Sequence, residues 1–429
     1  MNDSSPAGIE QSRKAVWIIS KYTSSAEYGF ESRLFAIARE FVRNGRQTVV
    51  IASDSNHLAT YPKFEKRYHY ESLDGVDTWW IRTLRYAKTV SIRRILSWLD
   101  FELKLLAMPK RGLPAPDVIV VSSLSLLTIL SGVWLRRRFR CKLVFEIRDI
   151  WPLTLVEEGG FSAWNPMVLV LGWIERFGYR RADLIIGTMP NLKAHVRNVT
   201  GEDLPCECVP FGFDPGGYAN ESPAESEGPV GDLPANRFIV GYAGSIGLTN
   251  ALETIMECAR RLAGDERFHF AFLGGGDRRE HFIELTRDLP NVTFLPKVPR
   301  SEVKSVLARF DLLYFAVYDS PVWDFGMSLN KLIDYMMSAK PILASYSGYP
   351  SMLDESGCGE FVPSADPDAL EAAIRRYGER DPEDLRRMGE RGRAWLLNHR
   401  RWDILALEYG RLLDGLGLED EMADAQADV

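Results

Sequence analysis

The chain has 429 residues, a length typical of two or three domains, and it is 46% hydrophobic and 26% charged, which excludes a disordered or fibrous protein. The net charge of -7 is unevenly divided, because residues 1–212 carry 29 lysines and arginines against 22 acids (+7) and the remainder carries 23 against 37 (-14). A basic first half predicts a negatively charged partner, and the absence of recognition motifs argues against nucleic acid.

The cysteines and the first residues bear on location. The chain has five cysteines, an odd number, and no two of them have zinc-finger spacing, which predicts reduced thiols. Residues 1–14 contain no apolar stretch of a signal peptide, and the longest apolar run, MVLVLGWI at 167–174, is too short to cross a bilayer. We therefore expect a cytoplasmic protein.

The first half alternates apolar runs with amphipathic segments. The run at 15–21 predicts a strand, and 31–44 has apolar residues at helical spacing, with Gly45 as the stop signal. Further strands are expected at 47–53, 117–123, 142–149 and 183–188, with a helix that ends near Arg181.

Residues 215–236 are rich in Pro, Gly, Ser and Glu, which predicts a linker, and the alternation then restarts. Strands are expected at 238–244, 268–274, 291–298, 311–317 and 340–345, and helices at 250–263, at 299–310 and from about Ser328. Buried strands alternating with helices predict an α/β fold with two Rossmann-like domains, whose parallel sheets face a central cleft. We expect a first domain at 14–212, a linker at 213–236, a second domain at 237–400, a helix at 401–416 that packs back on the first domain, and a disordered acidic tail at 417–429.

In such sheets, ligands bind at the carboxyl ends of the strands. Gly29 follows the first strand just before a helix, where it allows either a tight turn or the close approach of a ligand. Arg148 and Asp149 follow the strand at 142–147 and either face the cleft or form a structural salt bridge. Ser122 ends another strand, and His57 is a lone histidine whose more common role is structural.

Glycines follow two strands of the second half. GSIG at 244–247 and GGGD at 274–277 let a nucleotide lie against the backbone, although the dinucleotide and P-loop fingerprints are absent. No HExxH motif, histidine cluster or paired acids indicate a metal, so we expect metal-independent chemistry.

A lysine stands where acids are usual. Ser328 is the expected N-cap of the helix in SLNKLIDYMM, which places Lys331 at N3, against the positive end of the helix dipole. This lysine is either an accident on a solvated surface or part of an anion site with the first amides of the helix. Asp334, one turn further on, suits ribose hydroxyls, so together they predict a nucleoside diphosphate site.

With these motifs, the chain resembles the retaining glycosyltransferases of GT-B fold and family 4, particularly the bacterial O-antigen and capsule type. The resemblance covers about residues 14–413 and is carried by FEIRDIWP (145–152), IERFGYRRADLIIGTMPNLKAHV (174–196), GYAGSIG (241–247) and SLNKLIDYMMSAKPIL (328–343). It implies transfer of a sugar, an N-acetylated hexosamine or a related one, from a UDP-sugar donor to a lipid-linked saccharide in cell-surface polysaccharide synthesis.

The sequence departs from the family pattern in three places. Asp334 takes the second position of the family's Glu-x7-Glu motif, but the first falls on Gly326, so that Asp324 becomes the nearest substitute. The segment GSIGLTNAL lacks the Arg and Lys that many members use for the diphosphate, which shifts this role to Lys331. Ser122 and Ser123 stand where many members have a histidine.

The resemblance implies roles for individual residues. Lys331 would stabilise the leaving phosphate, and Asp149 would orient the acceptor. The implied donor-binding residues are Gly244, Ser245, Gly274, Gly275, Lys297, Val298, Asp324, Ser328, Leu329, Asn330, Lys331 and Asp334. The implied acceptor-binding residues are Gly29, Arg33, His57, Ser122 and Arg148. A nucleotide-sugar 2-epimerase and an inert nucleotide-sugar-binding module are the alternatives.

Two basic segments bear on the acceptor. Residues 81–106 interleave six cations with Trp98, Phe101 and several leucines, and residues 136–142 add five more. Without a spanning run, this pattern predicts peripheral binding to the anionic inner face of the cell membrane, where a polyprenyl-diphosphate-linked saccharide would be the acceptor. The alternative is a solvated basic face.

Overall fold

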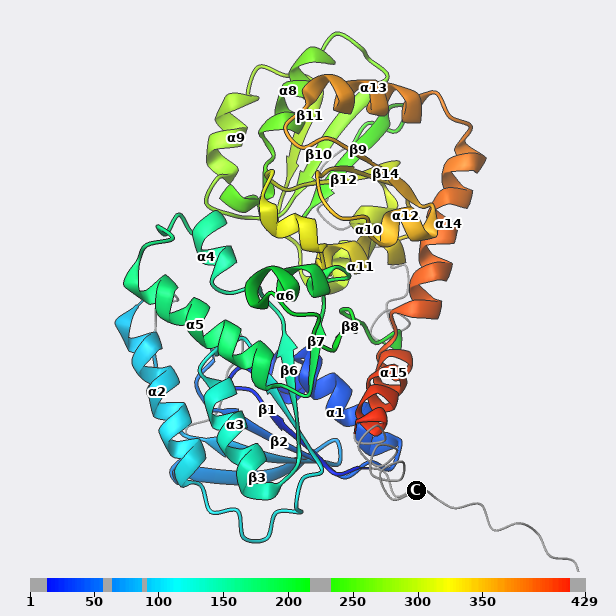
Figure 1. The fold of residues 1–429 in the computed structure, drawn as a ribbon. Helices are drawn as coiled ribbons and strands as arrows, with labels where there is room; N and C mark the ends of the chain where they lie inside the picture. The colour runs from blue at the N-terminus through cyan, green and yellow to red at the C-terminus, as the bar shows by residue number, and fades with distance from the viewer. Residues whose placement is uncertain (1–13, 57–63, 87–90, 217–232, 417–429) are drawn as a thin grey trace, which may run out of the picture.

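The computed structural model describes residues 14–56, 64–86, 91–216 and 233–416, which form two α/β domains, one above the other in Figure 1. The first domain contains an eight-stranded sheet of order β3-β4-β2-β1-β5-β6-β7-β8, and the second a six-stranded sheet of order β11-β10-β9-β12-β13-β14. Neighbouring strands in the two sheets pair in parallel except for the antiparallel pair β3–β4. The expected fold of two parallel-sheet domains is confirmed.

The elements of the first domain are β1 (Val16–Ile19), η1 (Ala26–Tyr28), α1 (Arg33–Arg43), β2 (Thr48–Ser53), β3 (Tyr68–Leu73), β4 (Val76–Ile81), α2 (Ile92–Ala107), β5 (Val118–Ser122), α3 (Thr128–Phe139), β6 (Lys142–Ile147), α4 (Leu153–Glu157), α5 (Pro166–Arg181), β7 (Leu184–Gly187), α6 (Leu192–Thr200) and β8 (Cys206–Cys208). The strands and helix expected up to Gly187 are present. The hairpin β3–β4 was not predicted, because β3 is an edge strand whose exposed and buried residues give no continuous apolar run.

The elements of the second domain are β9 (Phe238–Ala243), η2 (Leu248–Asn250), α8 (Glu253–Arg261), β10 (Phe268–Leu273), α9 (Arg279–Leu285), β11 (Val292–Leu295), α10 (Arg300–Ala308), β12 (Leu312–Ala316), η3 (Pro321–Phe325), α11 (Asn330–Met337), β13 (Ile342–Ser345), α12 (Met352–Ser356), β14 (Gly359–Val362) and α13 (Pro367–Gly378). Two helices end the described chain, α14 (Pro382–His399) and α15 (Trp402–Gly415). Residues 417–429, where a disordered tail was expected, lie outside the described residues.

The chain passes between the domains twice, and the two passages lie side by side. The Phe213 amide donates to the Arg400 carbonyl at 2.9 Å, and the Trp402 amide donates to the Phe213 carbonyl at 3.1 Å. A Cβ on Gly212 would come within 2.6 Å of the Trp402 ring, so only glycine fits this passage. The second passage brings α15 back to α1 (Figure 1). There the Phe41 and Tyr409 rings meet edge to face.

A segment of the second domain is also inserted into the first. Phe325 of η3 belongs to the apolar core that underlies α2, α3 and α5, and its ring meets His195 of α6 edge to face at 5.0 Å. Asn191 donates its backbone amide to the Phe325 carbonyl and its side-chain amide to the Asp324 carbonyl, at 3.0 and 2.9 Å. These contacts hold the loop before α11 against the first domain.

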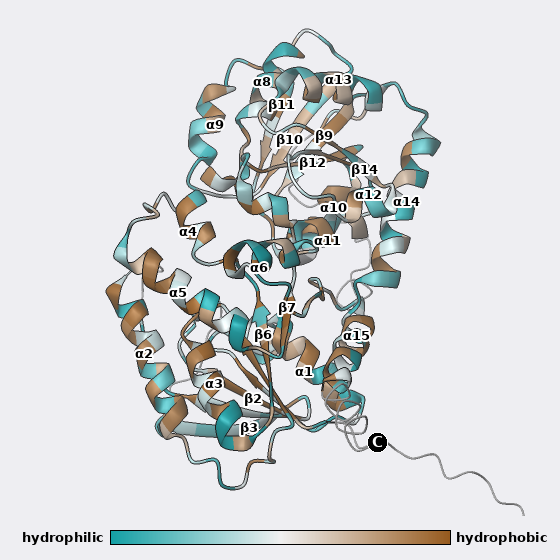
Figure 2. Ribbon diagram, in the orientation of Figure 1, coloured by the Kyte–Doolittle hydropathy of each residue, from teal (hydrophilic) through white to brown (hydrophobic). Residues whose placement is uncertain are grey.

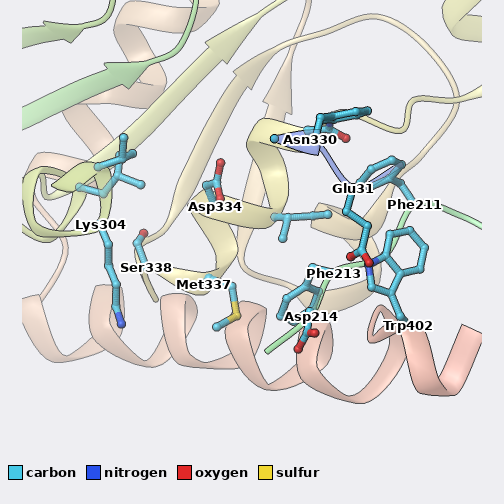
Figure 3. A pocket seen from close by; sticks show the side chains of 16 residues that line it. Glu31, Phe211, Phe213, Asp214, Lys304, Asn330, Asp334, Met337, Ser338 and Trp402 are labelled. Carbon is cyan, nitrogen blue, oxygen red and sulfur yellow. The ribbon is translucent and has the colours of Figure 1, made fainter. Parts of the chain in front are cut away.

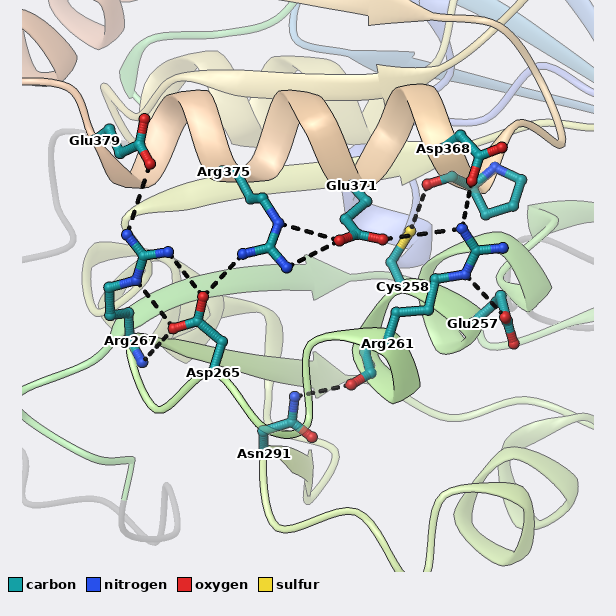
Figure 4. A network of polar contacts seen from close by, with 12 residues as sticks. Glu257, Cys258, Arg261, Asp265, Arg267, Asn291, Asp368, Glu371, Arg375 and Glu379 are labelled. Atoms are coloured by element: carbon teal, nitrogen blue, oxygen red, sulfur yellow. Dashed lines mark hydrogen bonds and ion pairs between the residues drawn. The ribbon is translucent and has the colours of Figure 1, made fainter.

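A polar network joins α8 to α13 on the outside of the second domain (Figure 4). Arg261 pairs with Glu257 and Asp368, and Asp265 pairs with Arg267 and Arg375. Several of these side chains are substantially exposed, so each ion pair contributes at most about 1 kcal/mol. The network therefore links two surface helices, and its residues do not form the cleft between the domains.

Tyr335 fixes α11 to the second sheet. Its hydroxyl accepts from the Ala243 amide at 2.8 Å and lies 3.0 and 3.1 Å from the carbonyls of Ala243 and Tyr314. All three partners belong to β9 and β12, so the helix is held at the centre of the sheet.

We predict that Tyr335→Phe lowers the free energy of unfolding by about 1–3 kcal/mol, because it leaves the buried Ala243 amide without its partner. Urea unfolding followed by circular dichroism measures the change. Tyr318→Phe is the matched control, since the Tyr318 hydroxyl bonds to Glu253 at the surface and its loss should cost within about 0.5 kcal/mol. Equal effects of the two substitutions would show that Tyr335 does not anchor the helix.

Candidate functional site

Two adjoining cavities lie between the domains. The larger, of about 480 Å³, is bounded by the loop after β1, the passage at residues 211–214, and helices α10 and α11 (Figure 3). The smaller, of about 310 Å³, lies between residues that follow β6, including Asp149, and residues 328–330. Phe211 and Asn330 line both cavities, so the first turn of α11 stands between them.

The start of α11 differs from the expectation. The helix begins at Asn330 with Leu329 as its N-cap, and the Ser328 hydroxyl does not cap it. The Ser328 hydroxyl instead accepts from the Phe211 amide at 3.3 Å, across the domain boundary. Lys331 is therefore at N2 and not at N3, still within the first turn, where unpaired amides and the helix dipole attract an anion.

Lys331 is a largely buried cation with neutral neighbours. Its ammonium donates to the Asn250 side-chain oxygen and lies 5.3 Å from the centre of the Tyr242 ring. Among the described residues, no carboxylate lies within ion-pair distance of it. Burial lowers the pKa of Lys331 to about 8. A buried ammonium of this kind is costly unless an anion neutralises it, which argues against a surface accident.

Asn250 was not among the predicted site residues. It ends η2, in the segment GSIGLTNAL, which lacks the basic pair expected for a diphosphate. The Asn250 side-chain oxygen accepts a hydrogen bond from the Lys331 ammonium and so holds it in place. The sequence signal for this role was the polar residue at position 250.

The glycines after β9 and β10 have a structural reason. The two loops bind each other, since the Ile246 amide donates to the Gly275 carbonyl at 2.9 Å. Gly274 has a φ of 138°, and a Cβ there would come 1.9 Å from the Gly244 carbonyl oxygen. Loop packing therefore demands glycine at 274 whether or not a nucleotide approaches.

The remaining donor-side candidates are scattered around these loops. The Ser245 carbonyl accepts from the Tyr242 hydroxyl at 2.6 Å. Lys297 is exposed, with its side chain 4.0 Å from a Cβ built on Gly275, and Val298 packs against the core of the second domain. Asp334 lines the larger cavity, one turn along α11 from Lys331 (Figure 3 shows Asp334).

The missing carboxylate at position 326 has a steric cause. Gly326 has a φ of 100°, and a Cβ there would come 2.4 Å from Pro190 of the first domain. No side chain fits at this contact. Asp324, the nearest substitute, is exposed, and neither Asp324 nor Lys331 lines the two cavities, so this substitution stays a prediction.

Arg148 and Asp149 both line the smaller cavity, and among the described residues they form no ion pair with each other. The Arg148 amide donates to the Ser123 hydroxyl at 2.9 Å, and its guanidinium lies 5.6 Å from the Phe211 ring. The surrounding protein raises the pKa of Asp149 through desolvation, against the opposing effect of Arg148 and Arg94. Asp149 is thus exposed towards the cavity, and the protein around it disfavours its charged form.

The other first-domain candidates divide into three groups. Gly29 lines the larger cavity, with a φ of 82° and open space beside it. Ser122 and Arg33 are each 1% exposed, and Arg33 forms an ion pair of 3.2 Å with the equally buried Glu146. Their burial removes both from contact with an acceptor, contrary to the expectation. His57 lies outside the described residues.

Sequence reasoning also missed two acids in the cavities. Glu31 lines the larger cavity, and Glu158 lines the smaller one. Desolvation raises the pKa of both carboxyls, and the charge of Asp149 adds to the effect on Glu158. Among the described residues, no group of three or more His, Cys, Asp or Glu is arranged to hold a metal ion.

Comparison with known proteins identifies both halves of the chain. The family model described as "Glycosyl transferase 4-like domain" matches residues 29–212, and the one described as "Glycosyl transferases group 1" matches residues 237–379. No curated protein matches the chain.

Many solved structures share the fold. A sucrose-phosphate synthase from Thermosynechococcus elongatus aligns with a TM-score of 0.65 and 19% identity, over 94% of this chain and 99% of that one. HepE from Anabaena in complex with UDP aligns with a TM-score of 0.62 and 15% identity, over 94% and 100%. An E. coli protein bound with UDP-2-fluoro glucose aligns with a TM-score of 0.66 and 11% identity, over 94% and 99%. At these identities the likeness establishes the fold.

We predict that Lys331→Met stabilises the protein at pH 7, because it removes a charge that burial disfavours. The pKa of Lys331 lies at about 8 in the folded protein against an ordinary value of 10.5, so the folded protein releases this proton first as the pH rises. The free energy of unfolding of the wild type should therefore rise relative to that of the variant between about pH 8 and 10.5. Urea unfolding at pH 7 and pH 10 measures both differences.

Lys297→Met is the control, since Lys297 is exposed and its replacement should change stability little at either pH. A variant Lys331→Met that is less stable than wild type at pH 7 would mean that the contacts with Asn250 and Tyr242 outweigh the burial.

Proposed function

The chain is a glycosyltransferase of the GT-B fold, and we propose that it is a retaining enzyme that transfers a sugar from a UDP-sugar to a lipid-linked saccharide. The sugar would be an N-acetylated hexosamine or a related one, and the product an intermediate of cell-surface polysaccharide such as O-antigen or capsule. The observation that carries the proposal is the partly buried Lys331 ammonium, in the first turn of a helix that stands between the two cavities.

The donor fits the second domain. Lys331 and the first amides of α11 supply fixed positive charge for a diphosphate, and Asp334 offers a carboxylate to ribose hydroxyls one turn along the helix. Structural relatives are described as complexes with UDP and with UDP-2-fluoro glucose, which supports a uridine nucleotide. Gly244 and Ser245 follow β9, Gly274 and Gly275 follow β10, and Lys297 follows β11, and these residues would border the nucleotide.

The proposed reaction takes place on one face of the sugar. The acceptor oxygen bonds to the anomeric carbon as the bond from that carbon to the UDP oxygen breaks, and the acceptor proton passes to the departing phosphate. Positive charge fixed where negative charge develops supplies the main stabilisation, a role for Lys331. Asp149 accepts a hydrogen bond from the acceptor hydroxyl and orients it, and Arg148 lines the same cavity.

The acceptor and the location follow from the first domain. The excess of seven positive charges over residues 1–212 favours an anionic partner, for which we propose a saccharide on polyprenyl diphosphate at the inner face of the cell membrane. No helix in the described part of the chain combines the length and the hydropathy needed to span a bilayer. Peripheral attachment is therefore the form of membrane contact that we propose.

A nucleotide-sugar 2-epimerase is the second candidate, favoured by the acids Glu31, Asp149 and Glu158, whose carboxyl pKa values desolvation raises. An inert binding module is the third, favoured by the glycine at position 326. The three candidate functions can be distinguished by incubating the protein with a panel of nucleotide sugars, with and without membrane lipid extract, and analysing the products by mass spectrometry. A lengthened lipid-linked glycan would indicate the transferase. An epimerised donor sugar in the absence of acceptor would indicate the epimerase, and UDP binding without turnover would indicate the binding module.

We predict that Lys331→Ala abolishes transfer and weakens UDP binding by about 1.5–3 kcal/mol, the value of a charge-assisted hydrogen bond, while the fold survives. Isothermal titration with UDP measures the affinity, and circular dichroism the fold. Lys331→Arg should also impair activity, because a planar guanidinium does not replace a compact ammonium. Lys340→Ala, just beyond the same helix, is the control and should bind UDP as wild type does. Unchanged UDP affinity and turnover in Lys331→Ala would refute the diphosphate role.

We predict that Asp334→Asn weakens UDP and UMP binding by the same factor, about tenfold, because both ligands carry the ribose and only UDP carries the second phosphate. Parallel titrations with the two nucleotides measure the ratio. A loss confined to UDP would place Asp334 at the diphosphate, and wild-type affinity for both would make it a surface acid.

A further inference from the structure

The first domain exposes a broad apolar face that its fold does not use. Helix α3 packs against both α2 and α5, so the three form one layer over the sheet, and apolar stretches are visible on all three in Figure 2. The exposed apolar side chains of this layer are Ile92, Ile95, Leu96, Leu99, Leu103, Leu106, Leu130, Trp134, Leu169, Val170 and Trp173, and Trp164 precedes α5. Trp164 is 84% exposed, Leu103 69% and Trp173 62%. A face of this kind marks an interaction site.

On α2 the exposed residues form a single stripe. Ile92, Leu96, Leu99, Leu103 and Leu106 recur every three or four residues along one side of the helix. The opposite side is buried, and it holds Trp98 and Phe101, which the sequence had placed at the membrane surface. The helix is therefore apolar on two sides, and only one side contacts the sheet.

The charges around this face are almost all positive. Each of the three helices carries three lysines or arginines, and their acids are Asp100, Glu102 and Glu175. Glu102 is buried against Thr128 and Ser131, Glu175 is buried against Tyr179 and His195, and Asp100 pairs with Lys104. The cations at the end of α3 include the exposed Arg137 and Arg138. Among the described residues of these three helices no acid is both exposed and unpaired, and an apolar face rimmed by cations complements an anionic bilayer.

The composition of the face favours a bilayer over a second protein copy. Three exposed tryptophans, Trp134, Trp164 and Trp173, suit the boundary between headgroups and acyl chains. Two copies that met through this face would also bring their arginines together, which is unfavourable.

The face also extends to the cleft. Glu158, which lines the smaller cavity, directly follows α4, and Trp164 lies six residues further along the chain. A bilayer against α5 therefore lies beside the cavity that contains Asp149.

We propose that the face formed by α2, α3 and α5 inserts its apolar side chains into the headgroup region of an anionic bilayer, and that this insertion, more than the charge of the basic segments, holds the protein at the membrane. The proposal rests on the lipid-linked acceptor proposed above and names the surface that meets it. Arg94 is not part of this contact, since its side chain turns inward to the rings of Tyr22 and Trp98.

The test is sedimentation of the full chain with vesicles of phosphatidylglycerol and phosphatidylcholine in equal parts, and with phosphatidylcholine alone, at low and high salt. Wild type should pellet with the anionic vesicles and remain partly bound at high salt, because salt screens charges and not apolar insertion. Leu99→Glu/Trp173→Glu should lower the partition coefficient at least about tenfold at both salt concentrations. Arg137→Glu/Arg138→Glu should lower binding at low salt and leave the salt-resistant part unchanged.

Leu285→Glu is the matched control, since Leu285 is an exposed leucine of α9 in the other domain, and it should bind vesicles as wild type does. Equal pelleting of Leu99→Glu/Trp173→Glu and wild type would overturn the proposal, as would wild type that stays in the supernatant. Sedimentation velocity without lipid adds a further outcome, because a wild-type dimer that this variant breaks would assign the face to a second copy and also overturn the proposal.

UDP affinity, measured on the same variants, keeps this test apart from that of the proposed function. Lost vesicle binding with unchanged UDP affinity in Leu99→Glu/Trp173→Glu supports the docking face. Vesicle binding that is unaffected, together with normal UDP binding, rejects the face and leaves the glycosyltransferase proposal intact.

Discussion

The anchoring of Phe325 in the core of the first domain is the contact on which the arrangement of the cleft depends. Phe325 belongs to the second domain by sequence, yet its ring packs beside His195, and Asn191 holds its carbonyl. Five residues later α11 begins, and Tyr335 fastens this helix to β9 and β12. The helix is thus positioned from both domains, so its first turn comes to stand between the two cavities.

This position explains why a lysine is kept where it destabilises the fold. Within the described part of the chain, Lys331 contacts an amide oxygen and an aromatic face, and burial lowers its pKa to about 8. A folded protein without ligand gains little from such a group, whereas a bound diphosphate would neutralise it and be held by it. Gly326 is set by the same architecture, because contact with Pro190 leaves no room for the carboxylate that the family resemblance implies there.

Features that follow from local periodicity could be predicted from the sequence, and features that depend on distant contacts could not. Buried strands such as β1 and β12 are continuous apolar runs, and the helix around Lys331 follows from its spacing. The exact cap was missed because the Ser328 hydroxyl is taken by Phe211, more than a hundred residues away. Arg33 was misplaced for a similar reason, since its partner Glu146 lies on another element, and Asn250 is recognised only once Lys331 is seen beside it.

The most direct test of the account is a crystal structure of the protein with UDP. The account predicts that the diphosphate lies within hydrogen-bond distance of the Lys331 ammonium and of the first amides of α11, with the ribose hydroxyls at the Asp334 carboxylate. A diphosphate bound elsewhere in the cleft, for instance at Lys304 or Lys297, with Lys331 still held by Asn250 alone, would contradict it.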